Sequence, residues 1–122
     1  MSIEYYQQPI LSYLHEIADV VLEIEAELRR RDRWEMQRPP TEYLASREPF
    51  CCDTLQVTQW LQWIFLPRMK VVLEGHEALP TESSIAAYAE ECFRNDPEPW
   101  GRLIELLQRY DDLIGEAALA AA

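Results

Sequence analysis

The sequence has few of the residues on which common catalytic and cofactor sites depend. It contains three glycines, three cysteines and two histidines in 122 residues. Three glycines are too few for a phosphate-binding loop or a dinucleotide-binding fingerprint, both of which need clustered glycines. His15 and His76 lie in no recognisable catalytic or metal-binding motif. We therefore predict no catalytic residues, no metal site and no cofactor.

The cysteines do not form a disulfide framework. They are odd in number, and Cys51 and Cys52 are adjacent, where a mutual disulfide would strain the intervening peptide. None of the usual paired metal-ligand spacings is present. We predict reduced, buried thiols at Cys51, Cys52 and Cys92, which is typical of a cytoplasmic protein.

Basic residues and long apolar runs are also scarce. Eleven basic residues against 22 acidic ones give a formal net charge of −11, which disfavours direct binding to nucleic acid or anionic lipid. Adjacent acids such as Asp111 and Asp112 are interpreted as part of a solvated acidic face. No apolar run approaches the ~18 residues of a membrane span, and residues 1–6 lack the features of a signal peptide. We expect a cytoplasmic protein without membrane attachment.

What the sequence does contain is apolar residues, 48% of the chain, enough for one sizeable core. In residues 12–34 their spacing alternates between three and four, which predicts a long helix with one apolar stripe. The stripe consists of Leu14, Ile17, Val21, Ile24 and Leu28. Acidic residues early in this segment and arginines late in it complement the helix dipole.

Residues 55–73 are apolar on almost every side, which indicates a central helix buried on most of its surface. We expect Asp53 or Thr54 to cap its start. Pro67 lies inside the segment, removes a backbone donor and crowds the carbonyl four residues earlier, so we predict a kink or break there. Gly75 is placed to end the element in a left-handed conformation.

An ordered loop is expected over residues 38–53, because Pro39 and Pro40 end the first helix and the stretch lacks the composition of a flexible linker. A single helical turn fits within it at residues 41–46. Its aromatic residues, Tyr43 and Phe50, are expected to hold the loop against the core.

Two further helices complete the expected fold. A short one starts at Ser83 or Ser84, and the last one has Asp96 as its N-cap and ends at Gly115. The Ala-rich tail, residues 116–122, either frays or extends the last helix. No segment alternates with period two, so the whole chain is predicted to be an all-α, single-domain bundle of four to five helices with a proline-bent central helix.

One basic cluster stands out at residues 29–33, with Trp34 beside it. In one interpretation its arginines complement a helix C-terminus and nearby carboxylates. In the other they touch RNA phosphate or an acidic partner, and Trp34 stacks on a base. We favour the structural interpretation.

Arg68 is the charge that packing explains least, because its helix is otherwise short of charge. Either it pairs with a nearby carboxylate, or its guanidinium receives an anion or a partner's carboxylate at the mouth of a cleft lined by Trp60 and Trp63. Core packing is the competing interpretation of the two tryptophans. The candidate binding residues are Arg68, Trp60, Trp63, Gln62 and Asp53.

These residues belong to a run that resembles a known family. The run consists of Pro49-Phe50, Asp53-Thr54, Trp60-Leu61-Gln62-Trp63, Pro67-Arg68-Met69 and Leu79-Pro80. It resembles the YqcC-like family of small bacterial all-helical proteins, which has no established activity. The resemblance extends loosely from the first helix to about Ile114. The family is associated with a tRNA pseudouridine synthase, and this association implies an accessory role.

Two hypotheses about function follow. The first is a non-enzymatic interaction or accessory module linked to tRNA modification, whose partner is another protein such as an RNA-modifying enzyme. The alternative is a helical domain that binds a small ligand or anion through Arg68 and the Trp60/Trp63 face. An enzyme of unidentified type is less favoured, because the sequence contains no catalytic motif. The chain is not expected to be the synthase itself, since a pseudouridine synthase resembles larger α/β enzymes that so short a helical chain cannot contain.

Overall fold

The first helix, α1 (Gln8–Arg30), follows the apolar periodicity of its sequence in a computed structural model that describes residues 8–121. Ile17, Ile24 and Leu28 of the stripe are fully buried, whereas Leu14 is half-buried. The expectation about a signal peptide concerns residues 1–6, which lie outside the described residues. The helix is thus confirmed, but it begins and ends earlier than the predicted range of 12–34.

α1 ends early because the chain turns into a left-handed conformation at Asp32, with φ of 58°. The Asp32 N–H donates to the Arg29 carbonyl (3.1 Å) and the Arg33 N–H to the Leu28 carbonyl (2.9 Å). This pair of bonds is a Schellman motif, in which glycine is the usual residue at the left-handed position and aspartate is tolerated. The motif redirects the chain so that Trp34 and the residues after it run towards the central helix.

The central helical stretch consists of α3 (Val57–Trp60), a π-helical turn η3 (Leu61–Phe65) and α4 (Leu66–Leu73). The Leu66 N–H donates to the Leu61 carbonyl, five residues back, directly before Pro67. The predicted interruption therefore takes the form of a widened turn, after which the helix continues. As predicted, Gly75 ends the stretch in a left-handed conformation, with φ of 85°.

The predicted cap of the central stretch was wrong. The N-cap is Gln56, which forms a reciprocal capping box with Gln59, and the Gln56 N–H donates to Gln59 Oε1 at 2.8 Å. Residues 51–55 turn before the helix, where the Leu55 N–H donates to the Cys51 carbonyl at 2.8 Å. Asp53 consequently faces the preceding loop, and its carboxylate accepts a hydrogen bond from the Ser46 hydroxyl (2.5 Å).

The connection over residues 38–53 contains α2 (Thr41–Leu44), the expected single turn, and a short 3₁₀ helix η2 (Pro49–Cys51). Phe50 stacks on Tyr88 with ring centroids 4.2 Å apart and meets Trp60 edge-on at 4.9 Å, so it does hold the loop against the core. Tyr43 is 43% exposed, and the corresponding prediction for it was wrong.

α5 (Ile85–Phe93) begins where predicted, but its cap comes from another helix. The Asp111 carboxylate accepts hydrogen bonds from the backbone N–H groups of Ile85 (3.1 Å) and Ala86 (2.9 Å), and from the Ser83 hydroxyl (2.6 Å). Asp111 is buried, so its assignment to a solvated face was wrong. Its neighbour Asp112 is exposed as expected.

α6 (Gly101–Ala121) starts later and ends later than predicted. Asp96 does not cap it and instead accepts a hydrogen bond from the Glu98 N–H (2.8 Å). The helix passes through Gly115, where the prediction of an end was wrong, and it includes most of the Ala-rich tail. Ala122 lies outside the described residues.

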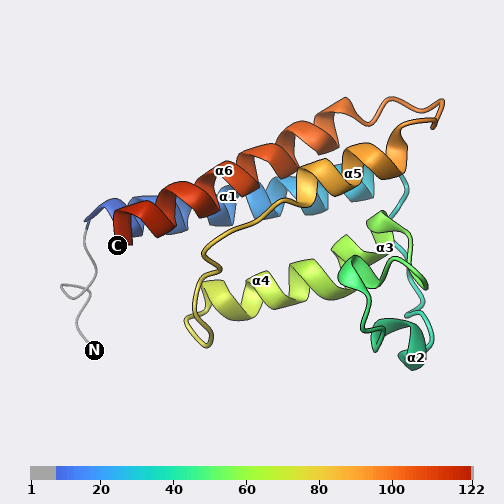
Figure 1. Cartoon of the computed structure of the whole chain (residues 1–122), viewed down its shortest axis with the longest axis horizontal. Coiled ribbons are helices and arrows are strands. Elements are labelled where there is room, and N and C mark those ends of the chain that lie inside the picture. Colours follow the sequence, from blue (N-terminus) through green and yellow to red (C-terminus); the bar gives the residue numbers. More distant parts are fainter. Residues whose placement is uncertain (1–7, 122) are drawn as a thin grey trace.

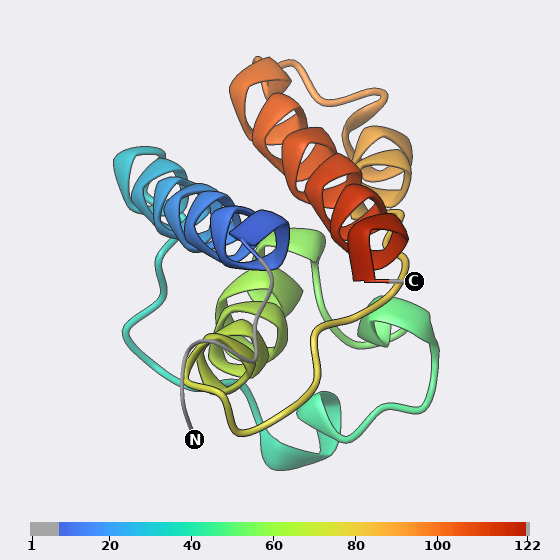
Figure 2. The same ribbon diagram turned by 90° about the vertical axis from the view of Figure 1, so that its left-hand side faces the viewer.

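The long helices form an all-α bundle. α1 and α6 lie side by side, α4 lies below them, and α5 packs against α6 (Figures 1 and 2). The core lies between α1, α4 and α6, where Tyr110 donates a hydrogen bond to Met69 Sδ (3.0 Å). Residues 8–121 include no β-strand, and no helix in this part of the chain is long and apolar enough to cross a membrane. The predicted fold class is confirmed.

Candidate functional site

The structure separates the two tryptophans proposed to share a cleft. Trp60 packs inward, with its ring 5.7 Å from that of Phe65 and 4.9 Å from that of Phe50. Trp63 faces the other way, towards the chain that follows α1. Arg68 is exposed and, among residues 8–121, forms no ion pair or side-chain hydrogen bond. The structure thus does not bring the three together in the groove described below, because Trp63 lines that groove and neither Trp60 nor Arg68 does.

Gln62 and Trp63 instead hold Glu35, a residue that the sequence did not single out. The Glu35 N–H donates to Gln62 Oε1, and Gln62 Nε2 donates to the Glu35 carbonyl, both at 2.8 Å. The Glu35 carboxylate accepts hydrogen bonds from Trp63 Nε1 (3.0 Å) and Gln59 Nε2 (3.1 Å). We call these four residues the Glu35 clamp. It satisfies the backbone and the carboxylate of Glu35 together.

The clamp depends on the local structure of both partners. The Schellman turn at Asp32 directs the chain so that Glu35 lies beside the central stretch. Gln59 lies at the end of α3, and Gln62 and Trp63 lie in the π-helical turn that follows. The signal in the sequence is that these three hydrogen-bond donors recur at spacings of three and four in a mostly apolar helix. Such a row of donors needs an acceptor nearby. π-Helical turns occur frequently at functional sites.

Next to the clamp, α1 and the central stretch border an open groove with a volume of about 850 Å³. Its lining is mostly apolar and comes from both helices and from the connection between them. The lining residues are Ala18, Val21, Leu22, Glu25, Trp34, Glu35, Met36, Gln62, Trp63, Leu66, Pro67, Lys70, Leu73 and Glu74. Leu22 is 67% exposed and Met36 is 90% exposed. We call this the α1–α4 groove.

Trp34, in the wall of the groove, is held by a cation–π contact with Arg29, which in turn pairs with Glu25. The Arg29 guanidinium lies 4.2 Å from the centre of the Trp34 ring, and Arg29 Nε is 2.9 Å from Glu25 Oε2. Cation–π contacts of this kind contribute about 0.5–1 kcal/mol at exposed sites. Trp34 is thus held by Arg29 at one end of the groove while the Glu35 clamp holds the next residue.

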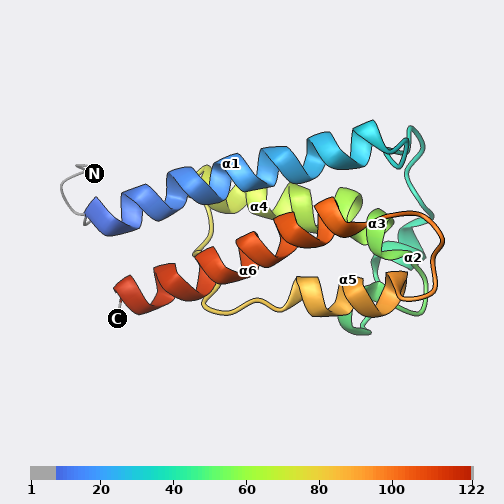
Figure 3. The ribbon, with the colours of Figure 1, turned by 90° about the horizontal axis from the view of Figure 1, so that it is seen from above.

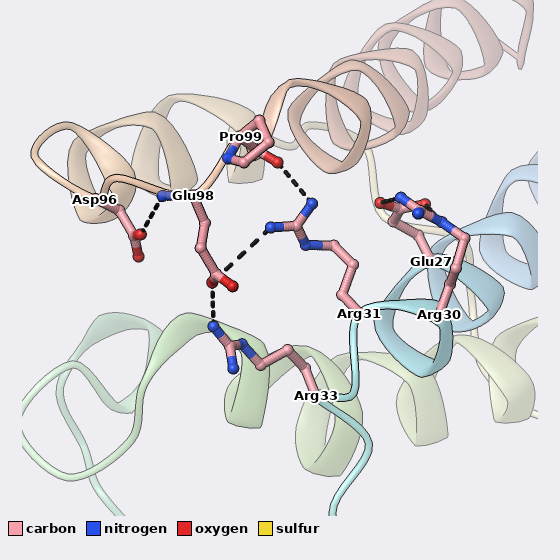
Figure 4. A network of polar contacts seen from close by, with 7 residues as sticks. All are labelled: Glu27, Arg30, Arg31, Arg33, Asp96, Glu98 and Pro99. Carbon is pink, nitrogen blue, oxygen red and sulfur yellow. Dashed lines mark hydrogen bonds and ion pairs between the residues drawn. The ribbon is translucent and has the colours of Figure 1, made fainter.

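The rest of the basic cluster is tied into the fold (Figure 4). Arg31 donates to the Pro99 carbonyl (2.6 Å), lies 3.9 Å from the Trp100 ring centre and approaches Glu98. Arg33 also pairs with Glu98. Arg30 pairs with Glu27 (2.6 Å), which raises the pKa of the arginine. These contacts agree with the structural interpretation of the cluster.

The cysteines are distributed differently from the prediction. Cys51 is buried, but Cys52 and Cys92 are exposed. The two exposed thiols line one pocket of about 510 Å³ together with Tyr88. Burial raises the pKa of Tyr88, and a hydrogen bond with Cys92 raises it further. Burial likewise raises the pKa of Tyr110 in the core.

Fold and groove together define a small helical bundle with an open apolar surface, and comparison with known proteins identifies its family. The model of the DUF446 family, described as tRNA pseudouridine synthase C, matches residues 16–113. The chain belongs to this family. The solution NMR structure of the protein YqcC from Escherichia coli matches with a TM-score of 0.76 at 27% identity, and the match covers 87% of this chain and 91% of that one.

Relatives in sequence agree with the YqcC-like resemblance. The uncharacterised YqcC of E. coli is 30% identical over 95 residues, which cover 78% of this chain and 87% of that protein. An uncharacterised protein of Haemophilus influenzae is 36% identical over 72 residues, 59% of this chain and 68% of that protein. A tRNA pseudouridine synthase C of Pectobacterium carotovorum is 39% identical over 70 residues, 57% of this chain but 19% of that protein. The function of this chain is therefore not given by its uncharacterised relatives.

Proposed function

We propose that this chain is a non-enzymatic interaction module and that the α1–α4 groove is the surface that binds its partner. The observation that carries the proposal is the exposure of Leu22 and Met36 beside a groove of about 850 Å³. Contiguous exposed apolar surface in a soluble protein marks a site of interaction. A groove between two helices is a common docking site for a segment of another protein.

The partner we propose is a tRNA pseudouridine synthase. Support comes from the relatives, since the region shared with this chain makes up most of YqcC but a small part of a protein named tRNA pseudouridine synthase C. Joining two modules in one chain raises the effective concentration of each for the other, which favours modules that work together. In this proposal the module acts as an accessory and leaves the chemistry to the synthase.

The test is co-purification of the tagged full chain with the synthase from the same genome. We expect the wild-type chain to retain the synthase and Leu22→Asp to lose it. The matched control is Leu119→Asp, because Leu119 is also a helical leucine, 80% exposed, outside the groove lining. Failure of the wild-type chain to retain the synthase, or equal retention by both variants, contradicts the proposal.

A second candidate function is the binding of a small ligand or anion. The volume of the groove falls within the roughly 300–1,000 Å³ of small-molecule sites, and Arg68 is exposed on α4, although it is not among the residues that line the groove. Thermal shift and tryptophan fluorescence across a metabolite panel test this candidate. A response that Arg68→Ala abolishes supports an anion site at Arg68, and no response in the wild-type protein rules the candidate out.

A further inference from the structure

Within the proposed interaction function, on which this inference rests, we propose that the α1–α4 groove binds an amphipathic helix whose apolar face is bordered by basic residues. The argument uses the shape of the groove, the charges at its rim and the rigidity of its walls.

The shape of the groove fits a helix. α1 and α4 run side by side (Figure 3). Both helices contribute residues to the groove, and the lining on the central stretch extends from Gln62 to Glu74. At a rise of 1.5 Å per residue this wall is roughly 18 Å long, which corresponds to about three turns of a bound helix. Apolar side chains spaced three and four apart on such a helix would meet Leu22, Met36 and Trp63.

The charged residues that line the groove are mostly acidic. Glu25, Glu35 and Glu74 line it against one cation, Lys70. Glu25 is paired with Arg29, which offsets part of its charge. The donors to the Glu35 carboxylate are a neutral indole and a neutral amide, so the clamp leaves the negative charge of Glu35 in place.

The exposed face of α1 extends this acidic rim. Asp19 and Glu25 lie three residues before and three residues after Leu22, so they share its side of the helix. Opposite charges at the rim of an interface raise the association rate and discriminate against partners of the wrong sign. Basic residues on the occupant therefore complement this rim.

The same charges argue against a second copy of this chain as the occupant. Each copy carries a formal net charge of −11, so a symmetric dimer through this face would bring two acidic rims together. Like charges at close range repel, and low salt strengthens the repulsion.

The walls of the groove are already ordered. The Glu35 clamp fixes the connection after α1, and the contact of Arg29 with Trp34 fixes the end wall. A site that does not have to be ordered on binding loses less free energy to conformational entropy. We therefore expect binding to shift the NMR signals of groove residues without changing the secondary structure.

The experiment uses two synthetic peptides with the same leucine pattern at helical spacing, one with lysine and one with glutamate at the polar positions. Each is titrated into the ¹⁵N-labelled full chain. We expect the leucine–lysine peptide to bind and to shift signals from residues 18–25 and 62–74, and the leucine–glutamate peptide not to bind. In the complex, the peptide would bury Leu22 at the centre of the site. We therefore expect Leu22→Asp to weaken peptide binding by about tenfold or more, and Leu119→Asp to leave it unchanged.

Charge variants distinguish the effect of the acidic residues at the groove rim on peptide binding from the effect of the overall negative charge of the chain. Asp19→Lys and Glu74→Lys should each weaken binding of the lysine peptide more than Glu90→Lys, which makes the same change of charge at an exposed site on α5. Circular dichroism and the midpoint of thermal unfolding check that every variant folds.

Three results would overturn the inference. They are equal binding of both peptides, signal shifts spread over the whole acidic surface, and a dimer in solution that Leu22→Asp dissociates. If the peptides fail but the synthase co-purifies in a manner sensitive to Leu22, the interaction module stands and the proposed occupant is wrong. If the lysine peptide binds in the groove but the synthase does not co-purify, the groove and its ligand chemistry stand and the synthase is the wrong partner.

Discussion

At the scale of single residues, Gln62 shows how one polar side chain can position a segment distant in sequence. It is buried, and its amide bonds both backbone groups of Glu35, 27 residues earlier in the chain. A donor and an acceptor of the backbone are thereby satisfied where no secondary structure supplies partners. The sequence identified Gln62 as a candidate for binding a ligand. In the structure its hydrogen-bonding groups are directed to Glu35.

Gln62→Ala should destabilise the protein. It leaves the N–H and carbonyl of Glu35 without their partners, and a buried unsatisfied group costs about 1–3 kcal/mol. We expect a loss of roughly 2–4 kcal/mol in the free energy of unfolding, measured by urea denaturation. Gln108→Ala is the control, because Gln108 bonds Asp112 on the exposed face of α6, and it should change stability by less than about 0.5 kcal/mol. If Gln62→Ala lowered the free energy of unfolding no more than Gln108→Ala does, the Glu35 clamp would contribute little to stability.

At the scale of elements, the helices are specified locally but their ends are not. Spacings of three and four in the sequence predict α1, α5 and α6 because the pattern lies within each segment. The starts of α5 and α6 and the end of α1 depend on other parts of the chain or on backbone conformation. Asp111 caps α5 from 25 and 26 residues away, and a single-sequence pattern contains no signal for such a partner.

The same limit applies to the candidate site. The sequence directed attention to Gln62 and Trp63, which do line the groove, and also to Trp60, Arg68 and Asp53, which do not. Trp60 and Trp63 are three residues apart, and an ideal α-helix would place them on roughly the same face. The π-helical turn begins between them. Trp60 packs against Phe50 and Phe65, whereas Trp63 bonds Glu35.

Asp111→Ala should cost far more stability than the same change at its neighbour Asp112. Asp111 satisfies two backbone N–H groups and one hydroxyl at the start of α5, and loss of a capping side chain costs about 0.5–2 kcal/mol, more where the donors are buried. Asp112→Ala removes an exposed carboxylate and should change the free energy of unfolding by less than about 0.5 kcal/mol. Chemical denaturation of both variants gives the comparison, and similar values would contradict the capping role.

Two glycines should respond to alanine with opposite signs. Gly115 lies inside α6, and an added Cβ meets no atom within 4 Å, so Gly115→Ala should stabilise the protein by about 0.5–1 kcal/mol. Gly75 has φ of 85°, so Gly75→Ala should destabilise it by about 1–2 kcal/mol. The midpoints of thermal unfolding should move in opposite directions. A rise in both would mean that Gly75 does not need the left-handed conformation.

At the scale of the whole molecule, the bundle keeps one thiol inside and two outside. Cys51 is buried within the loop that Phe50 attaches to α5, while Cys52 and Cys92 are exposed. The two exposed thiols are accessible to a reagent in the folded protein. The thiol of Cys51 becomes accessible only when its loop opens locally or when the whole protein unfolds.

Reaction with a thiol-specific reagent under native conditions should therefore proceed in two phases. We expect two thiols to react quickly and one slowly, with the slow phase following the equilibrium between folded and open states. Cys51→Ala should remove the slow phase, and Cys92→Ala should reduce the fast phase by half. A single fast phase of three thiols would show that the loop containing Cys51 opens readily.

The π-helical turn has a consequence for the faces of α4. It holds one residue more than an α-helical turn does, so every side chain after it is rotated by about 100° relative to an uninterrupted α-helix. Removal of one residue from Leu61–Phe65 would turn Met69 and Val72 away from the core and shift Lys70 and Glu74 around the helix. The extra residue in the π-helical turn thus determines which side of α4 packs against the core and which side borders the groove.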